Sequence, residues 1–370
     1  MKAPYSCKPV ATRVLATIVS AAMLWTSAAQ SCTSFLLTAK DGSKVYGRTL
    51  EFGVDMKSQV TLLPRGYVMA GSLPNGEKGK RWTSRYAALG MNGFGLPIMI
   101  DGFNEKGLAG GMLFFPGYAK FVPATDAPKV KAIGSWEFLA WALTNYASVA
   151  EVKQAIAAGE VVIADTVQSD LGIAPPLHYT LHDRSGASVV IEPVDGKLVM
   201  TDNPYTVLTN SPEISWHTTN LRNYTTITPR FPQPITMMGQ TLTPFSTGAG
   251  MRGLPGDQSS PDRYVQAVAL VVTLQTPVNA DESVQNAEHI LNHFDIPNGS
   301  TGEYSGIKGQ GSFEITYWTA ISDLSNLRFY FKTYDNQHLR YVNMHDFDLN
   351  AKAVKYVPTT QPFAPQNLNS

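Results

Sequence analysis

The sequence predicts an α+β fold in one domain, on the basis of three observations. Short stretches of alternating apolar and polar residues, typical of β-strands, occur in the first part of the chain and again in its last part. Segments with helical apolar spacing lie between them, without the regular strand–helix alternation of a parallel α/β protein. The chain has 370 residues, of which 44% are hydrophobic, so it can bury a large core. We therefore expect layers of sheet and helix around a single core.

The first expected elements are strands separated by turn residues. Strands are predicted at 33–39 and 44–52, joined by the turn sequence Lys-Asp-Gly-Ser. Residues 96–121 are predicted to form two strands around the turn sequence Asn-Glu-Lys-Gly. A helical pattern then covers 135–158, with Ser135 at its start.

The second half of the chain continues with strands, helices and strands again. Three stretches are predicted to be short strands, with an Asp-Gly-Lys hairpin turn in the second of them: 178–183, 187–202 and 205–210. Helices are predicted at 260–274 and 280–294, the first with Pro261 in its opening turn. Further strands are predicted within 314–344, and they complete the α+β pattern.

The first 31 residues have the features of a cleaved secretory signal peptide. Basic residues precede a short apolar stretch, and small residues follow it. Ala29 and Ser31 occupy positions −3 and −1 of a cut directly before Cys32, as the small-residue rule requires. We therefore assign 1–31 to a signal peptide and 32–370 to a single mature domain, which we expect to be exported to the periplasm or the extracellular space.

The sequence leaves two alternatives to cleavage at this bond. The leader could remain as an N-terminal anchor, although its apolar stretch at 14–25 is short for a membrane span. Cys32 could instead carry a lipid, but bacterial lipoproteins usually have Leu where this chain has Ala29. Lipidation would block both the amine and the sulfur of Cys32, so it is incompatible with a catalytic role for that residue.

The charge of the mature chain argues against nucleic-acid and membrane partners. Removing 1–31 takes away three basic residues and no acidic residue, which leaves 26 Lys and Arg against 29 Asp and Glu, a formal charge of −3. Such a chain offers no strongly basic surface for nucleic acid or anionic lipid. No later stretch approaches about 18 uninterrupted apolar residues, so we expect no stable membrane insertion after processing.

Cys32 is the candidate nucleophile, because loss of the leader also removes Cys7 and leaves one thiol without a disulfide partner. A papain-like site would pair this thiol with a histidine. The chain has seven histidines, none in a recognisable catalytic motif: His178, His182, His217, His289, His293, His338 and His345. His289 and His293 could share a helix face, but they lack a third ligand, so we expect no metal site. No glycine-rich phosphate loop is present, and no cofactor is expected.

The position of Cys32 supplies a different base. If cleavage exposes this residue, its own α-amine, with a pKa of about 7.7–8.0 in model peptides, can accept a proton near neutral pH. The thiol, at about 8.5, then needs only a neighbouring cation to become substantially ionised. Nucleophile and base would belong to one residue, as in enzymes with an N-terminal threonine. Export processing would then also activate the enzyme.

Cys32 and five ordered blocks of sequence resemble the choloylglycine hydrolase family, which includes bile salt hydrolases and penicillin V acylases. The blocks cover nearly the whole mature chain: 47–52, 101–119, 203–224, 253–264 and 329–336. The resemblance implies a four-layer αββα sandwich of the N-terminal nucleophile hydrolase type. It also implies hydrolysis of a linear amide C–N bond that does not belong to a peptide.

The resemblance assigns five catalytic residues. Cys32 is the nucleophile and its α-amine the proton shuttle, and Arg48 is the arginine beside the thiol, where a guanidinium stabilises a thiolate. Glu51 occupies a position where many members have Asp, and a carboxylate there would hold the α-amine. Asn210 matches the asparagine whose amide stabilises the oxyanion. Arg263 matches the arginine that supports the nucleophile.

Three further residues are candidates for substrate contact. Phe114 lies where many members have an Asn or Tyr that contributes a second oxyanion donor, and a Phe side chain cannot donate. A backbone N–H could serve instead, another residue could substitute, or the hole could be weaker. Phe114 and Phe115 could line the acyl pocket or pack in the core. Asn203 is a candidate polar contact, with a turn role before Pro204 as the alternative.

The resemblance leaves three substrate classes open: conjugated bile acids, penicillin V and N-acyl homoserine lactones. Predicted export favours the two acylase activities, with conjugated bile acids close behind. Two rival functions remain, namely an exported binding protein without turnover and a papain-like secreted peptidase that would need a catalytic histidine. The family often forms tetramers, so a homotetramer is an expectation from the resemblance alone.

Overall fold

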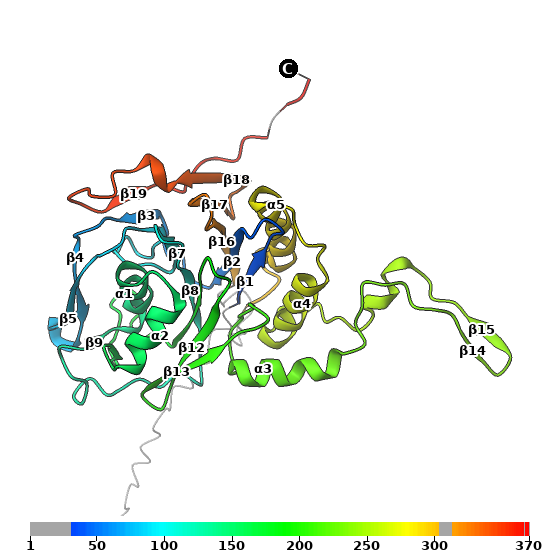
Figure 1. Ribbon diagram of the computed structural model, residues 1–370, viewed down its shortest axis with the longest axis horizontal. Helices are drawn as coiled ribbons and strands as arrows, with labels where there is room; N and C mark the ends of the chain where they lie inside the picture. Colours follow the sequence, from blue (N-terminus) through cyan, green and yellow to red (C-terminus); the bar gives the residue numbers. More distant parts are fainter. Residues whose placement is uncertain (1–30, 303–312, 366, 370) are drawn as a thin grey trace, which may run out of the picture.

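Two antiparallel sheets packed face to face form the centre of the protein, and helices cover their outer faces (Figure 1). The computed structural model describes residues 31–302, 313–365 and 367–369. The predicted signal peptide lies outside the described residues, apart from Ser31. The four layers confirm the predicted αββα architecture of the α+β class.

The smaller sheet combines the first strands of the described chain with strands near its C-terminus. Its order is β1 (Cys32–Thr38), β2 (Lys44–Phe52), β16 (Ile315–Asp323), β17 (Arg328–Thr333) and β18 (Asn336–Asn343). In the β1–β2 register, Cys32 lies opposite Leu50 and Ser34 lies opposite Arg48. Paired side chains share a face of the sheet, so this register places the candidate nucleophile and the candidate arginine on the same face.

The larger sheet has eight strands. Its order is β13 (Lys197–Asp202), β12 (Ser188–Val194), β11 (Leu177–His182), β8 (Ala109–Phe114), β7 (Asp101–Asn104), β6 (Ala88–Met91), β3 (Val60–Leu63) and β19 (Lys355–Val357). Strands β7 and β8 contact β1, β2 and β16 across the interface between the sheets. The candidate site lies at this interface.

The helices divide between the two outer faces. Helices α4 (Ser260–Thr273) and α5 (Ala280–Leu291) cover the smaller sheet, and α1 (Phe138–Asn145) covers the larger one. Helix α2 (Val149–Ala157) follows α1 on the same side (Figure 1). Helix α3 (Ile214–Asn220) contacts α4.

Two sequence predictions of local structure need correction. The helical pattern at 135–158 is broken, because Tyr146 is extended and Ser148 caps a new helix by accepting a hydrogen bond from the Glu151 amide. Residues 205–210 form no strand. They lie along the open edge of β1, where the backbones of Ser34 and Leu208 exchange two hydrogen bonds of 2.9 and 3.0 Å. This segment covers an edge that would otherwise expose unpaired backbone groups.

The remaining strands form two-stranded sheets: β4 (Val68–Ser72) with β5 (Lys78–Thr83), β9 (Ala132–Ile133) with β10 (Val162–Ile163), and β14 (Ile235–Met237) with β15 (Gln240–Leu242). The β14–β15 hairpin projects away from the four layers (Figure 1). Short 3-10 helices complete the structure: 74–76, 135–137, 221–224, 247–251, 292–294 and 344–346. Within the described ranges, no helix has both the length and the apolar character needed to cross a membrane.

Candidate active site

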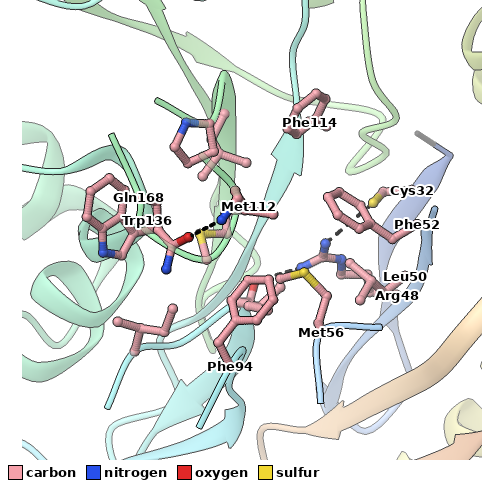
Figure 2. Close-up of a pocket in the computed structure, with 15 residues that line it drawn as sticks. Cys32, Arg48, Leu50, Phe52, Met56, Phe94, Met112, Phe114, Trp136 and Gln168 are labelled. Carbon is pink, nitrogen blue, oxygen red and sulfur yellow. Dashed lines mark hydrogen bonds between the residues drawn. The ribbon is translucent and has the colours of Figure 1, made fainter. Parts of the chain in front are cut away.

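Cys32 is the first residue of β1 and is only 2% exposed. Its sulfur accepts a hydrogen bond from Arg48 Nη2 at 3.5 Å, and the same thiol lines an apolar pocket between the sheets (Figure 2). Burial raises the pKa of the Cys32 thiol, and the positive charge of Arg48 partly offsets this by lowering it. Glu51 also raises this pKa and Arg263 lowers it, so the site holds a buried thiol whose ionisation depends most on burial and on the Arg48 guanidinium.

Arg48 is fully buried in the middle of β2 and is held from several directions. Its Nη1 donates to the Ile100 carbonyl at 2.6 Å, and its guanidinium lies 5.3 Å from the centre of the Trp318 ring. Asp101 Oδ2 lies 3.9 Å from Nη1. Burial alone would lower the pKa of Arg48, but Cys32 and Asp101 together raise it, so this residue is a fixed cation.

The backbone of Cys32 is bound by Asn210 and Arg263. The Cys32 N–H donates to Asn210 Oδ1 at 2.7 Å, and Arg263 Nη2 donates to the same oxygen at 2.9 Å. Arg263 Nη1 donates to the Cys32 carbonyl at 2.5 Å and to Thr33 Oγ1 at 2.8 Å. Asn210 Nδ2 donates to the Phe114 carbonyl at 2.8 Å. Residues from β1, β8, α4 and the 205–210 segment thus meet around one residue.

Glu51 lies on the opposite face of β2 from Arg48, because strand side chains alternate. Its Oε1 accepts a hydrogen bond from Thr316 Oγ1 at 3.0 Å, and its Oε2 is buried without a hydrogen-bond partner. Its backbone N–H donates to the Ser31 carbonyl at 3.2 Å, which brings it beside the predicted cleavage bond. Burial raises the pKa of Glu51 to about 8, and Arg263 acts in the opposite direction.

The pocket beside Cys32 is almost entirely apolar. Phe114 lines it and meets Phe52 edge-on, with ring centres 6.0 Å apart (Figure 2). The other apolar lining residues come from both sheets and their loops: Leu50, Met56, Phe94, Ile98, Ile100, Met112, Trp136, Leu171, Pro175 and Leu177. Gln168 also lines the pocket, but its amide bonds to Asp170 and to the Leu171 N–H. The pocket therefore suits an apolar group placed beside the thiol.

Two of the predicted substrate contacts lie elsewhere. Phe115 is fully buried on the other side of its strand from Phe114 and stacks on His178, with ring centres 4.3 Å apart. Asn203 donates to the Val207 carbonyl at 2.9 Å and belongs to a separate surface hollow. The structure supports a packing role for Phe115 and a turn role for Asn203, because neither residue lines the Cys32 pocket.

The structure adds residues that the sequence did not single out. Asp101 faces Arg48 from β7, and Trp318 packs against Arg48 from β16. His178 and His217 hydrogen-bond through Nε2 to the carbonyls of Thr209 and Asn210, each at 3.0 Å. These contacts join residues far apart in the chain, so no local motif could have revealed them.

The histidine pair considered as metal ligands is exposed: His289 lies in α5 and His293 in the 3-10 helix that follows it. Across the described ranges, no group of three or more His, Cys, Asp or Glu side chains is placed to hold a metal ion.

Comparison with known proteins places this geometry in a family. Residues 32–357 match the family model described as linear amide C–N hydrolases, choloylglycine hydrolase family. The bile salt hydrolase/transferase of Clostridium perfringens is 30% identical over 328 residues, which cover 88% of this chain and 95% of the relative. A conjugated bile acid hydrolase of Lactobacillus gasseri is 30% identical over 328 residues, covering 88% of this chain and all of the relative. The penicillin V acylase of Pectobacterium atrosepticum is 24% identical over 359 residues, covering 91% and 87%.

Solved structures agree with this assignment. A variant of the C. perfringens conjugated bile acid hydrolase superposes with a TM-score of 0.79 at 29% identity, over 91% of this chain and all of the other. The penicillin V acylase of Agrobacterium tumefaciens superposes with a TM-score of 0.70 at 22% identity, over 88% and 91%. The second likeness shows the shared fold.

Proposed function

This chain belongs to the choloylglycine hydrolase family of linear amide C–N hydrolases, and we propose that it cleaves its substrate through an acyl-enzyme on Cys32. The observation that carries the proposal is the placement of this one cysteine. Its sulfur meets Arg48 at the mouth of an apolar pocket, and its backbone nitrogen meets Asn210. The Cys32 thiol and backbone thus contact both the Arg48 guanidinium and the Asn210 amide, and thiol acyl transfer requires groups of these kinds beside the nucleophile.

We propose that the active form begins at Cys32. Two observations support cleavage of the Ser31–Cys32 bond: the family match starts at this residue, and the small residues Ala29 and Ser31 precede it. Cleavage would turn an amide nitrogen into an amine within reach of Asn210 and beside Glu51. Only the amine can accept a proton, so a chain with an uncut bond lacks its base. The leader also supports the proposal that the mature protein is exported.

In the proposed reaction, the α-amine takes the thiol proton and the sulfur attacks the amide carbonyl. A tetrahedral intermediate forms and collapses when the C–N bond breaks, with the α-ammonium returning its proton to the leaving amine. Water, deprotonated by the α-amine, then attacks the thioester and releases the carboxylic acid and the thiol. Arg48 stabilises the thiolate, and Glu51 and Arg263 hold the amine and backbone of the nucleophile.

Asn210 is the proposed oxyanion donor. A side-chain amide has two N–H bonds, and the Phe114 carbonyl takes one of those on Asn210 Nδ2 at 2.8 Å. The other is available for the oxyanion. Phe114 therefore contributes a carbonyl that orients this amide and a ring that lines the pocket. It contributes no side-chain donor, so Asn210 carries more of the stabilisation.

We propose an amide of an apolar carboxylic acid as the substrate, with glycine- or taurine-conjugated bile acids as the first candidates. The apolar lining supports an apolar acyl group. Relatives at 30% identity include named bile acid hydrolases, whereas the named penicillin V acylase is 24% identical. Penicillin V and N-acyl homoserine lactones, which predicted export favours, are the alternatives.

The deciding experiment joins intact mass with a panel of amides. The secreted protein should have the mass of 32–370, and it should release an amine and a free acid from one of the three substrate classes. A matched chain that retains residues before Cys32 should be inactive on the same substrate. A mature chain that starts elsewhere, or is blocked at Cys32, would contradict the mechanism. Ligand binding without turnover on the whole panel would support the binding protein instead.

Histidine contacts bear on the papain-like alternative. The described hydrogen bonds of Cys32 run to Arg48, Asn210 and Arg263, and His178 and His217 bond to backbone carbonyls. Burial lowers the pKa of His217 to about 4, so it is neutral at pH 7. The proposed mechanism needs no histidine as a proton shuttle.

We also propose that the protein assembles with further copies of itself, and that the family's tetramer is the expected form. The hairpin that projects in Figure 1 supports this proposal. The hairpin and the residues just after it expose large apolar side chains: Ile235, Met237, Met238, Leu242 and Phe245. An exposed apolar patch of this kind is typical of a protein interface. Light scattering should give a tetramer mass, and Met238→Asp with Phe245→Asp should reduce it. A monomeric wild-type protein would refute the assembly.

A further inference from the structure

Asp101 is a buried carboxylate directly behind the arginine of the active site. It is the first residue of β7, is fully buried, and holds Oδ2 3.9 Å from Arg48 Nη1. Within the described residues no close hydrogen bond reaches either carboxylate oxygen, and the nearby Tyr46 hydroxyl lowers the pKa of Asp101 less than Arg48 does. A buried charge without hydrogen bonds is unfavourable unless an opposite charge compensates it, so its main interaction is with the cation in front of it.

Asp101 is not what holds Arg48 in place. The guanidinium donates to the Ile100 carbonyl at 2.6 Å and to the Cys32 sulfur at 3.5 Å, and it packs against the Trp318 ring. These contacts fix the orientation of the guanidinium without any bond to the carboxylate. Loss of the Asp101 charge would therefore leave Arg48 where it is.

Among the described residues, the titratable side chains packed beside this pair are neutral. The Tyr46 hydroxyl is buried beside it, and burial together with the Asp101 charge raises the pKa of Tyr46 well above its usual value, so this hydroxyl is neutral. His182 lies with its ring centre 5.1 Å from that of Tyr46, and burial lowers its pKa to about 3, so it is neutral. Arg48 and Asp101 are thus the charged groups on this side of the thiol.

The larger sheet keeps this space free of side chains at Gly111 of β8. A Cβ atom at this position would lie 2.5 Å from the Tyr46 hydroxyl oxygen and 3.1 Å from both Arg48 Nη1 and Asp101 Oδ2. Any other residue would therefore displace the Tyr46 hydroxyl and crowd both the carboxylate and the guanidinium. The glycine preserves the approach of the two charged groups.

We propose that Asp101 is a positioning residue that places a counter-charge behind Arg48 and thereby limits how strongly Arg48 stabilises the Cys32 thiolate. The proposal rests on the proposed role of Cys32 as nucleophile. The positive charge of Arg48 is shared between two groups, the Asp101 carboxylate near Nη1 and the Cys32 sulfur near Nη2. An ionised Asp101 keeps the thiol protonated to a higher pH, and a thiolate of higher pKa is the stronger nucleophile.

The protonation of Asp101 would make this effect depend on pH. Burial raises the pKa of Asp101 to about 6, although Arg48 opposes the rise. Above pH 6 the carboxylate is ionised and the counter-charge is present. Below pH 6 the carboxyl is neutral, and Arg48 acts on the thiol without opposition.

The test is the rate of alkylation of Cys32 by iodoacetamide as a function of pH, followed by intact mass. In Asp101→Asn the midpoint of the alkylation profile should move down by about one pH unit, which is about a tenfold larger thiolate fraction below both midpoints. Because a thiolate of lower pKa is a weaker nucleophile, the reaction there should be about threefold faster. Asp101→Glu keeps the charge and should restore most of the wild-type midpoint. Asp323→Asn, at a fully buried carboxylate at the end of β16, should not move it.

An unchanged or higher midpoint in Asp101→Asn would overturn the proposal, because a merely structural role would loosen Arg48 and raise the pKa of the thiol. If Asp101→Asn does not fold, the wild-type profile decides: a step near pH 6 supports the proposal and its absence overturns it. Alkylation needs no amide substrate. If no substrate is turned over, the alkylation midpoints can still be measured and compared. The absence of turnover would then count against the proposed function alone.

Discussion

The two faces of β2 show how the site treats the sulfur and the nitrogen of the same residue differently. On the face toward the larger sheet, Arg48 meets the Cys32 sulfur among apolar pocket residues. On the opposite face, Glu51 lies with Thr316 and within the electrostatic influence of Arg263. Cys32 is the first residue of β1. Its side chain lies on the same face as Arg48, whereas its backbone is bound by Asn210 and Arg263.

Strand β2 therefore separates two different electrostatic environments around Cys32. The face of β2 toward the larger sheet, here called the pocket face, places the cation Arg48 and its counter-ion Asp101 beside a buried thiol. The opposite face, here called the helix face because α4 and α5 cover it, supplies the Glu51 carboxyl and the Arg263 guanidinium. A carboxylate there suits an amine. A change at Arg48 should therefore have the larger effect on the ionisation of the thiol, on which Glu51 and Arg263 also act. A change at Glu51 should have its main effect on the amine and on the stability that depends on this carboxyl.

Replacing Cys32, which contacts groups on both faces, should have the largest effect on kcat/KM. Cys32→Ala should lower kcat/KM by at least about 10³-fold, because no other residue supplies the nucleophile. Cys32→Ser keeps the α-amine and an oxygen, and it should retain a small residual rate. Amide hydrolysis measured on purified, correctly processed variants checks this. Full activity in Cys32→Ser would rule out thiol catalysis.

Arg48→Met tests the pocket face alone. Loss of the guanidinium should raise the pKa of the thiol by about 1–3 units and lower kcat/KM at pH 7 by about 10²-fold. It also leaves Asp101 as an uncompensated buried charge, which should reduce the free energy of unfolding by about 3 kcal/mol.

The double variant Arg48→Met with Asp101→Asn is the matched control. It should recover the stability, because the lone charge is gone, but not the activity. Thermal unfolding and a pH–rate profile separate these two effects. Recovery of activity in the double variant would show that Arg48 acts only through packing.

Glu51→Gln tests the helix face through the pH dependence of stability. In the uncut chain the folded-state pKa of Glu51 is about 8, above its unfolded value of about 4.5. The neutral carboxyl therefore stabilises the folded state below pH 4.5, and this contribution is lost as pH rises to 8, on the order of 4 kcal/mol at most. Glu51→Gln should lack this loss.

Denaturant unfolding of both chains between pH 4.5 and 8 provides the measurement. The processed chain should show a smaller loss than the uncut one, because a nearby α-ammonium would lower the pKa of Glu51. Parallel stability curves for the wild type and Glu51→Gln would contradict the raised pKa.

Asn203→Ala affects neither face and should have the smallest effect. The side chain of Asn203 bonds to the Val207 carbonyl, so its loss should reduce the free energy of unfolding by about 1 kcal/mol. Values of kcat/KM should stay within about twofold of the wild type. A tenfold fall in kcat/KM with normal stability would return Asn203 to the substrate site.

Local sequence predicted most of the elements but not their interruptions. Alternation and turn residues identified β1, β2, β11, β12 and β13, and Pro261 marked the first turn of α4. The break at Tyr146 was not visible, because apolar spacing continues through it. Residues 205–210 alternate like a strand but pair with β1 only at Leu208. Other backbone groups of this segment bond to the side chains of Asn203, His178 and Ser260 instead.

The candidate site was predicted unevenly for a similar reason. Cys32, Arg48, Glu51, Asn210 and Arg263 lie in recognisable blocks, and the structure brings all five together. Phe115 and Asn203 lie in the same blocks but outside the Cys32 pocket. Phe115 directly follows Phe114 at the end of β8 and stacks on His178, and Asn203 follows β13 and bonds to the Val207 carbonyl. Asp101 lies within a block too, and no signal in the sequence distinguished it from its neighbours.

By itself, the sequence determined the α+β class, the family and the one cysteine on which chemistry could depend. These follow from local patterns and from residue identity, which the chain carries without folding. Only the tertiary structure decided which side of β2 each group occupies, that Phe114 lends a carbonyl to Asn210, and that a buried Asp101 stands behind Arg48. Such facts depend on sheet register and on strands distant in the chain, and burial gives the resulting charges their strength.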